Sequence, residues 1–252
     1  MKTFKCFLIF LLLFTGTLCF AQTKDTLKIL FVGNSYTFVS NMPHIVSLIS
    51  DSTKTKLITS KSTLGGSTLS NHWNGERGLK TKEIIKSGNF DIVVLQEFSM
   101  STINNQDSFM LHAKKFCDYI KEHGAKPYFY ETWAREKVPQ WQKTITEMYH
   151  KAASENNAGL VKVGEARELA LKLRPQLELY QADGSHPSDL GALLAACVFV
   201  QAFTNEIPDK LPSRFTIFDG YGQSLDLLDF IDQLDIRFFL EVVKEISEKE
   251  DF

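Results

Sequence analysis

The stretch that decides the fold is LKILFVGNSYT, residues 27–37. Five of the six residues in 27–32 are apolar, as is typical of a strand buried in a sheet. Gly33 permits a tight turn and Asn34 tolerates unusual backbone conformations, so the strand ends abruptly and presents the Ser35 hydroxyl. The sequence therefore predicts a buried strand with a candidate nucleophile just beyond its carboxyl end. An ordinary polar turn between a strand and a helix is the other interpretation of this stretch.

Strand-like apolar runs alternate along the chain with longer stretches of helical period. The expected strands are residues 27–32, 57–61, 91–96, 126–131 and 159–164. The expected helices are residues 42–51, 78–87, 106–123, 139–156, 164–174, 188–203 and 224–247. This alternation indicates an α/β protein with a parallel sheet covered on both faces. In open parallel sheets ligands bind beyond the carboxyl ends of the strands, so the functional residues are expected there.

The first 21 residues have the pattern of a secretory signal peptide. Lys2 and Lys5 precede the apolar run 6–14, and Ala21 is a small residue before the expected cleavage point. The run is shorter than the roughly 20 residues that span a bilayer. We expect an exported protein in which residues 22–252 form one domain that ends with the helix 224–247. The sequence leaves periplasm and cell exterior as open alternatives.

Composition excludes several partners. The chain has 28 Lys and Arg residues against 30 Asp and Glu residues, which gives a formal net charge of −2. Nucleic-acid-binding domains carry an excess of positive charge, so no nucleic-acid partner is expected. After cleavage of the leader no stable membrane insertion is expected, and oligomeric state stays open. Neither the cysteine spacing nor the histidines supply a recognisable ligand set, so no metal is expected.

The second informative stretch is QADGSHPSDLGALLAA, residues 181–196. Pro187 favours an extended backbone at His186 and can open the helix that follows. Asp183 stands three positions before His186, so its carboxylate can reach one ring nitrogen and fix the tautomer while the other nitrogen acts as a base. The pair is also compatible with a simple helix-capping turn.

Two further stretches can supply hydrogen-bond donors for a negatively charged oxygen. Gly65 and Gly66 follow the second expected strand, and a glycine lets a backbone N–H approach a substrate without side-chain obstruction. Gln96 ends the third expected strand and carries an amide donor. Taken alone, Gly65 and Gly66 could equally form a flexible turn, and Gln96 could equally be a polar strand end. Together with Ser35 and the Asp183–His186 pair, they place one set of catalytic groups on one sheet edge.

The order of these motifs resembles that of the SGNH (GDSL-type) hydrolases. Residues 33–35, GNS, resemble the first block with Asn34 in place of Asp, Gly66 matches the glycine of the second, and residues 183–187, DGSHP, resemble the last. The third block reads Leu95-Gln96-Glu97, with Gln96 as the stand-in for the family asparagine. The resemblance implies a flavodoxin-like three-layer α/β/α sandwich and cofactor-free ester hydrolysis. It also implies a Ser35–His186–Asp183 triad with an oxyanion hole formed by Ser35, Gly66 and Gln96.

The substrate is less clearly encoded. Trp73 and Trp133 fall in or just after loops at the carboxyl edge, where a ring could stack on a sugar, and His72 lies beside them. Arg135 or Glu131 could reach the pocket or be surface charges. We expect an esterase for a small-molecule or glycan ester, with carbohydrate O-acetyl groups favoured. A short-chain lipid esterase, a thioesterase and a non-catalytic carbohydrate-binding protein on the same fold are the alternatives.

Overall fold

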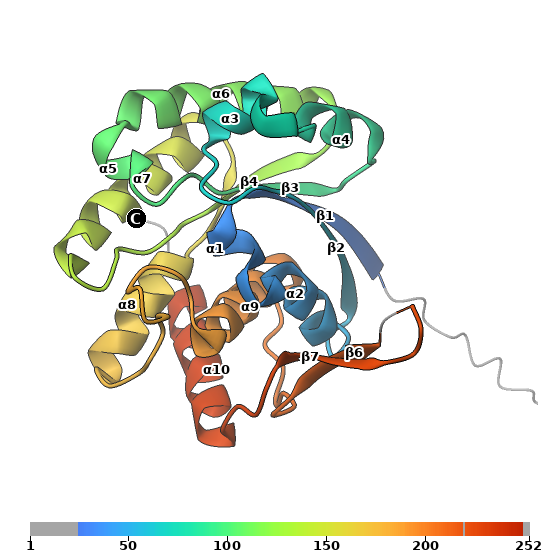
Figure 1. Ribbon diagram of the computed structural model, residues 1–252, viewed down its shortest axis with the longest axis vertical. Coiled ribbons are helices and arrows are strands. Elements are labelled where there is room, and N and C mark those ends of the chain that lie inside the picture. The colour runs from blue at the N-terminus through green and yellow to red at the C-terminus, as the bar shows by residue number, and fades with distance from the viewer. Residues whose placement is uncertain (1–24, 219, 249–252) are drawn as a thin grey trace, which may run out of the picture.

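The centre of the molecule is a five-stranded parallel sheet with strand order β2-β1-β3-β4-β5 (Figure 1). The computed structural model describes residues 25–218 and 220–248, so the expected leader, residues 1–21, lies outside the described residues. The strands are β1 (Asp25–Gly33), β2 (Thr55–Thr63), β3 (Ile92–Leu95), β4 (Lys126–Tyr130) and β5 (Gly159–Val161). The expected parallel sheet is confirmed, and its strand order is that of flavodoxin-like folds.

Helices cover both faces of this sheet and complete a three-layer sandwich (Figure 1). The upper layer in Figure 1 contains α3 (Leu69–Asn74), α4 (Thr81–Ser87), α5 (Ser101–Asn104), α6 (Gln106–Glu122) and α7 (Gln142–Glu155). The lower layer contains α1 (Ser35–Phe38), α2 (Met42–Ser50), α8 (Val163–Leu173), α9 (Asp189–Thr204) and α10 (Gln233–Glu248). Short 3₁₀ turns are η1 (Val39–Asn41), η2 (Glu76–Gly78) and η3 (Pro139–Trp141).

The continuous apolar run of β1 follows from its burial on both faces. Ile29 and Phe31 belong to the core shared with α2, α9 and α10, whereas Leu30 and Val32 belong to the core shared with α6 and α7. All four side chains are fully buried. Because successive side chains of a strand point to opposite faces, a central strand covered by two helical layers needs apolar residues at every position.

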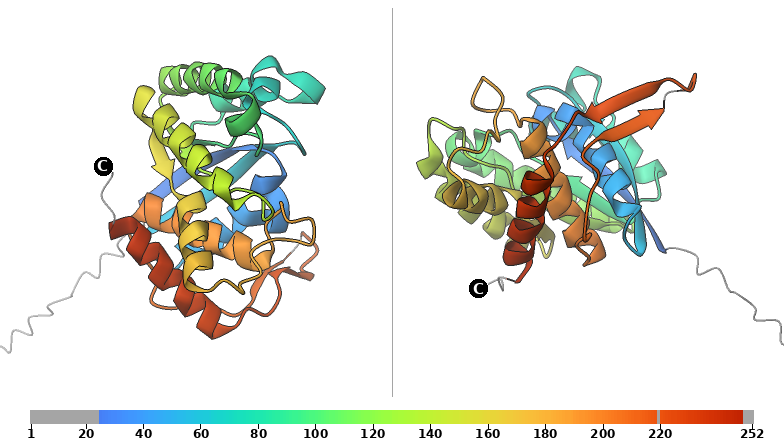
Figure 2. Two further views of the ribbon diagram at one scale, coloured as in Figure 1. Left: turned by 90° about the vertical axis from the view of Figure 1, so that its left-hand side faces the viewer. Right: turned by 90° about the horizontal axis from the view of Figure 1, so that it is seen from below.

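The expected C-terminal helix 224–247 is wrong at its start. Residues Ser224–Leu228 form β7, which pairs antiparallel with β6 (Phe215–Phe218), and this hairpin projects from the body (Figure 2). The helix α10 begins at Gln233, where the Asp232 carboxylate accepts a hydrogen bond from the backbone N–H of Leu234 at 2.7 Å. An Asp at a helix start is a recognised cap, and this signal marks the true beginning of the helix.

Candidate active site

Ser35 begins the short helix α1 directly after β1, at the carboxyl edge of the sheet. Asn34 caps this helix, because its Oδ1 accepts a hydrogen bond from the backbone N–H of Tyr36 at 3.1 Å. Its Nδ2 donates to the carbonyl of Ser67 at 2.9 Å, which ties the Gly66 loop to the end of β1. An aspartate could make the first bond but could not donate the second. The Asn in place of the family Asp therefore has a structural role.

The structure brings Ser35, His186 and Asp183 together across 151 positions of sequence. His186 Nε2 lies 2.8 Å from Ser35 Oγ, and His186 Nδ1 lies 2.5 Å from Asp183 Oδ2. Because an ionised carboxylate only accepts, the Nδ1 proton faces Asp183 and leaves Nε2 to accept the serine proton. The hydroxyl and the imidazole thus have the geometry of a nucleophile and its base.

Asp183 is held as an anion by its hydrogen bonds. The His186 ring lowers the pKa of Asp183 to about 2, and the backbone N–H groups of Ser185 and His186 assist by donating to Oδ1 at 2.9 and 3.0 Å. Its side chain is 47 % exposed, so these bonds rather than burial set the ionisation. The carboxylate remains charged throughout the neutral pH range.

Backbone pairing holds the segment that carries His186. Tyr180 and Pro187 form an isolated antiparallel bridge, and the N–H of Gln181 donates to the carbonyl of His186 at 2.9 Å. Ser188 then caps α9, since its Oγ accepts from the N–H of Gly191 at 3.1 Å. The histidine therefore sits on a short hairpin fixed at the start of α9, a helix whose middle residues 191–200 are buried.

Trp133 supports this hairpin from beneath and does not face a substrate. Its ring stacks on Tyr36 with centroids 4.6 Å apart and planes 3° from parallel, and the guanidinium of Arg167 lies 4.1 Å from the ring centroid. Its Nε1 donates to the carbonyl of Ser185 at 3.0 Å, while the Tyr36 hydroxyl is 2.7 Å from Ser185 Oγ. Trp133 is 1 % exposed, so the expectation that it stacks on a sugar is wrong.

His72 is a buried structural residue and not a substrate-binding one, which corrects the second expectation. It is 0 % exposed, and its Nε2 lies 3.0 Å from the carbonyl of Gly33 and 2.9 Å from Ser67 Oγ. Its Nδ1 lies 2.7 Å from Thr81 Oγ1. Burial lowers the pKa of His72 to about 4, so the ring is neutral at pH 7. Because a carbonyl only accepts, the ring proton lies on Nε2.

Trp73 also packs within the protein. Its ring is edge-on to Phe116 at 5.2 Å and to Tyr119 at 6.0 Å, both on α6. The ammonium groups of Lys82 and Lys115 lie 4.8 and 5.6 Å from its centroid. These contacts belong to the upper helical layer and include no residue of the triad. The expected role of Trp73 in sugar stacking therefore has no geometric support.

Gln96 supports the Ser35 turn from inside the sheet. It is 0 % exposed, and its Oε1 accepts from the N–H of Asn34 and from the Thr37 hydroxyl, each at 2.9 Å. Its Nε2 donates to the carbonyl of Glu97. The Oε1 and one N–H of this amide are therefore bonded to protein groups, and the expected oxyanion role of Gln96 stays a prediction. The glutamine side chain is one methylene group longer than that of asparagine, and its amide oxygen lies against the turn of residues 34–37.

The Gly66 loop remains open to a ligand. Gly65 and Gly66 are exposed, Gly66 has φ +67°, and no atom lies within 4 Å of where a Cβ would stand at either position. Within the described residues, no protein acceptor takes the backbone N–H of Ser35 or of Gly66. Both N–H groups are thus available on the side of the sheet edge that carries the serine.

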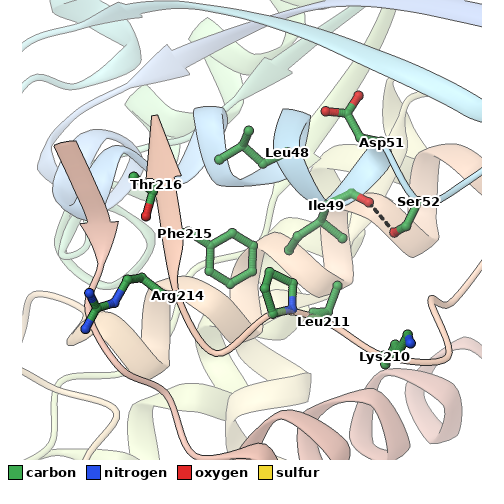
Figure 3. A pocket seen from close by; sticks show the side chains of 10 residues that line it. Leu48, Ile49, Asp51, Ser52, Lys210, Leu211, Arg214, Phe215 and Thr216 are labelled. Carbon is green, nitrogen blue, oxygen red and sulfur yellow. Dashed lines mark hydrogen bonds between the residues drawn. The ribbon is translucent and has the colours of Figure 1, made fainter. Parts of the chain in front are cut away.

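One hollow in the described part of the chain lies away from the triad. A hollow between α2 and residues 210–216 is lined mainly by apolar side chains such as Leu48, Leu211 and Phe215, with no triad residue among its lining (Figure 3). Among residues 25–218 and 220–248, no group of three or more His, Cys, Asp and Glu side chains is placed to hold a metal. No helix in that part of the chain is long and apolar enough to cross a membrane.

Several solved structures are similar to this one. No protein-family model matches the sequence, and no curated protein matches it. A candidate SGNH hydrolase from Slackia heliotrinireducens is 26 % identical, with a TM-score of 0.59, over 71 % of this chain and 100 % of that one. The chain is therefore similar to SGNH hydrolases in its structure.

Further structures share this SGNH hydrolase fold at lower identity. A DUF4886 family protein from Bacteroides uniformis has a TM-score of 0.71 and 18 % identity over 88 % of this chain and 95 % of that one. The esterase EstA from Pseudoalteromonas has a TM-score of 0.57 and 12 % identity over 71 % of this chain and 97 % of that one. These likenesses confirm the expected three-layer fold, and the SGNH hydrolases among the similar structures support hydrolase activity.

Proposed function

We propose that this protein is an exported serine esterase in which Ser35, His186 and Asp183 form the catalytic triad. The observation that carries the proposal is the unbroken hydrogen-bonded chain from Ser35 Oγ through the imidazole to Asp183, with distances of 2.8 and 2.5 Å. Ser35 is half-buried at the sheet edge and reachable from solvent. A core serine or a simple helix cap would not require an imidazole on its hydroxyl.

The reaction follows from this geometry in two steps. Ser35 Oγ attacks the ester carbonyl while its proton passes to His186 Nε2, which gives a tetrahedral intermediate. When this intermediate collapses, the acyl–oxygen bond of the ester breaks and the imidazolium donates its proton to the leaving alcohol. Water then enters, gives a proton to Nε2 and attacks the acyl-enzyme. Collapse of the second intermediate releases the acid, and the proton on Nε2 returns to Ser35. Asp183 stabilises the imidazolium in both steps.

The negative charge on the intermediate is received by backbone groups. The N–H of Ser35 and the N–H of Gly66 have no acceptor among the described residues, and the Asn34 side chain ties the Gly66 loop to the turn that carries the serine. Removal of one such donor typically costs on the order of 10²–10³ in rate. We assign Gln96 the separate task of holding the Asn34 turn, because its Oε1 accepts from the Asn34 N–H and its Nε2 donates to the Glu97 carbonyl.

We infer that the acyl group is small and that the alcohol part is a carbohydrate. The acetyl xylan esterase AlAXEase shares the fold, with a TM-score of 0.54 and 18 % identity over 69 % of this chain and 98 % of that one. This likeness supports a carbohydrate acetyl ester as the substrate of the present chain. The leader-like residues 1–21 would place the enzyme where glycans occur.

The test is acetate release from a panel of acetylated polysaccharides, with an acyl thioester and a short-chain lipid ester as further arms. Wild type is expected to release acetate from at least one glycan, and Ser35→Ala is expected to lower its rate by at least about 10³-fold. Faster turnover of the lipid ester or thioester would replace the carbohydrate assignment. Equal rates for wild type and Ser35→Ala would remove the esterase mechanism.

A further inference from the structure

The guanidinium of Arg135 has no carboxylate partner, although it is half-buried. It lies on the loop after β4, where its Nη2 donates to Ser99 Oγ at 3.3 Å and its buried Nε has no hydrogen-bond partner. None of the ion pairs formed by the described residues includes it. A buried donor without an acceptor is unfavourable, so this group is suited to an acceptor supplied from outside the chain.

Backbone contacts place Arg135 beside the segment that carries the triad. The N–H of Glu136 donates to the carbonyl of Gly184 at 2.9 Å, and Gly184 directly follows Asp183. On its other side, Ser99 belongs to the loop after β3, three positions beyond Gln96, which holds the turn before Ser35. The side chain therefore bridges the two loops that flank the sheet edge between β3 and β4.

A second unpaired arginine lies on the opposite flank. Arg77 is exposed and its Nη1 donates to the carbonyl of Gly65 at 3.1 Å, next to Gly66. The same loop is joined to the end of β1, because the N–H of Leu64 donates to the carbonyl of Gly33 at 3.2 Å. No ion pair of the described residues includes Arg77 either. Two arginines without an ion pair among the described residues thus lie on loops at the carboxyl edge of the sheet, one after β2 and one after β4, on either side of β1 and β3.

We propose that Arg135, assisted by Arg77, binds a carboxylate on the alcohol part of the ester, so that the substrate is an O-acylated acidic sugar. This inference rests on the proposed esterase function and adds a substrate class to it. Arginine presents several N–H donors in a planar fork that matches a carboxylate, and such charge-assisted bonds are stronger than neutral ones. Glu136 does not neutralise the site, since its carboxylate lies over Gly184 and forms no ion pair with Arg135.

The test compares acetylated oligosaccharides that differ only at one group, which is a carboxylate, a neutral primary alcohol or a sulfate. For wild type, kcat/KM is expected to be highest for the carboxylate. In Arg135→Met the ratio of kcat/KM for the acidic over the neutral substrate is expected to fall at least about tenfold. Arg135→Lys is expected to keep part of the ratio. The control Arg214→Met, which removes an arginine paired with Asp226 and Asp229, is expected to keep all of it.

Two results would overturn this inference and leave the esterase intact: no preference of wild type for the acidic substrate, or the same ratio in wild type and Arg135→Met. A preference for sulfate would overturn the carboxylate assignment. A binding measurement separates the two proposals, because unesterified acidic sugar should bind Ser35→Ala and bind Ser35→Ala/Arg135→Met at least about tenfold more weakly. If Arg135→Met does not fold, the acidic preference of wild type must still decline with added salt; a salt-independent preference contradicts the proposal.

Discussion

The ring of Trp133 lies parallel to the ring of Tyr36, with centroids 4.6 Å apart. This stack connects the turn after β1, where Ser35 lies, to the loop after β4. Both rings also bond to Ser185, the residue before His186. The tryptophan is therefore placed to fix the imidazole relative to the serine, a role that its position in the sequence did not suggest.

Trp133→Phe keeps an aromatic ring on Tyr36 but loses the Nε1 bond to the Ser185 carbonyl, so we expect kcat to fall on the order of tenfold with a smaller change in KM. Trp133→Leu loses the stack as well, so its kcat is expected to fall further, toward the hundredfold loss that small displacements of catalytic groups can cause. Steady-state kinetics on p-nitrophenyl acetate measures both. Trp141→Phe, outside the site, is the matched control, and equal kinetics for Trp133→Phe and Trp141→Phe would contradict the positioning role.

Asp183→Asn should preserve the loop and remove the charge. Asn Oδ1 can still accept from the N–H groups of Ser185 and His186, but the imidazole loses the anion that fixes its tautomer. We expect kcat to fall on the order of 10³–10⁴-fold. Asp189→Asn, which changes a carboxylate bonded to Ser40 at the start of α9, should retain most activity. If Asp183→Asn kept wild-type kcat, Asp183 would not belong to the catalytic machinery.

How far the sequence predicts this molecule can be judged from particular residues. The buried run of β1 and the Asp183–His186 spacing are local patterns, so they were sufficient to place the sheet, the serine and the pair. The hairpin of β6 and β7 was missed because the expected helix 224–247 treated Leu227 and Leu228 as one face of a helix. Only pairing with residues 215–218, which is not local, makes them a strand.

The roles of the aromatic residues could not be read from the sequence for a similar reason. A tryptophan in a loop can cover a ligand or support a neighbouring loop, and the choice depends on which surfaces lie against it. Arg167 on α8 covers one face of Trp133, and Phe116 and Tyr119 on α6 lie edge-on to Trp73. A histidine likewise becomes structural only when Gly33, Ser67 and Thr81 converge on it, and these come from three separate segments.

His72 predicts a loss of stability in acid. Its pKa is about 4 in the folded protein against an ordinary 6.5, so the unfolded chain takes up a proton first as the pH falls. The free energy of unfolding should therefore decrease as the pH falls from about 6.5 to about 4. His72→Gln, whose amide can still donate to Gly33, should flatten that part of the curve. Urea denaturation at several pH values measures it, and an unchanged slope in the variant would contradict the burial of a neutral ring.

Glu131 predicts the opposite slope at higher pH. Burial raises its pKa to about 8 from an ordinary 4.5, so the folded protein holds a proton that the unfolded chain releases. The free energy of unfolding should fall as the pH rises from about 4.5 to about 8. Glu131→Gln cannot ionise, so its free energy of unfolding should fall less between pH 5 and pH 8 than that of wild type. The same denaturation series checks it, and identical pH slopes for wild type and Glu131→Gln would exclude this buried protonated carboxyl.

The most direct measurement on the central claim is mass spectrometry after reaction with a fluorophosphonate, which forms a stable adduct with an activated serine. One adduct per chain is expected, on the peptide that contains Ser35, with no adduct in Ser35→Ala and much slower labelling in His186→Ala. Labelling of wild type at another residue, or at Ser35 with the same rate in His186→Ala, would contradict the account of a serine activated by His186.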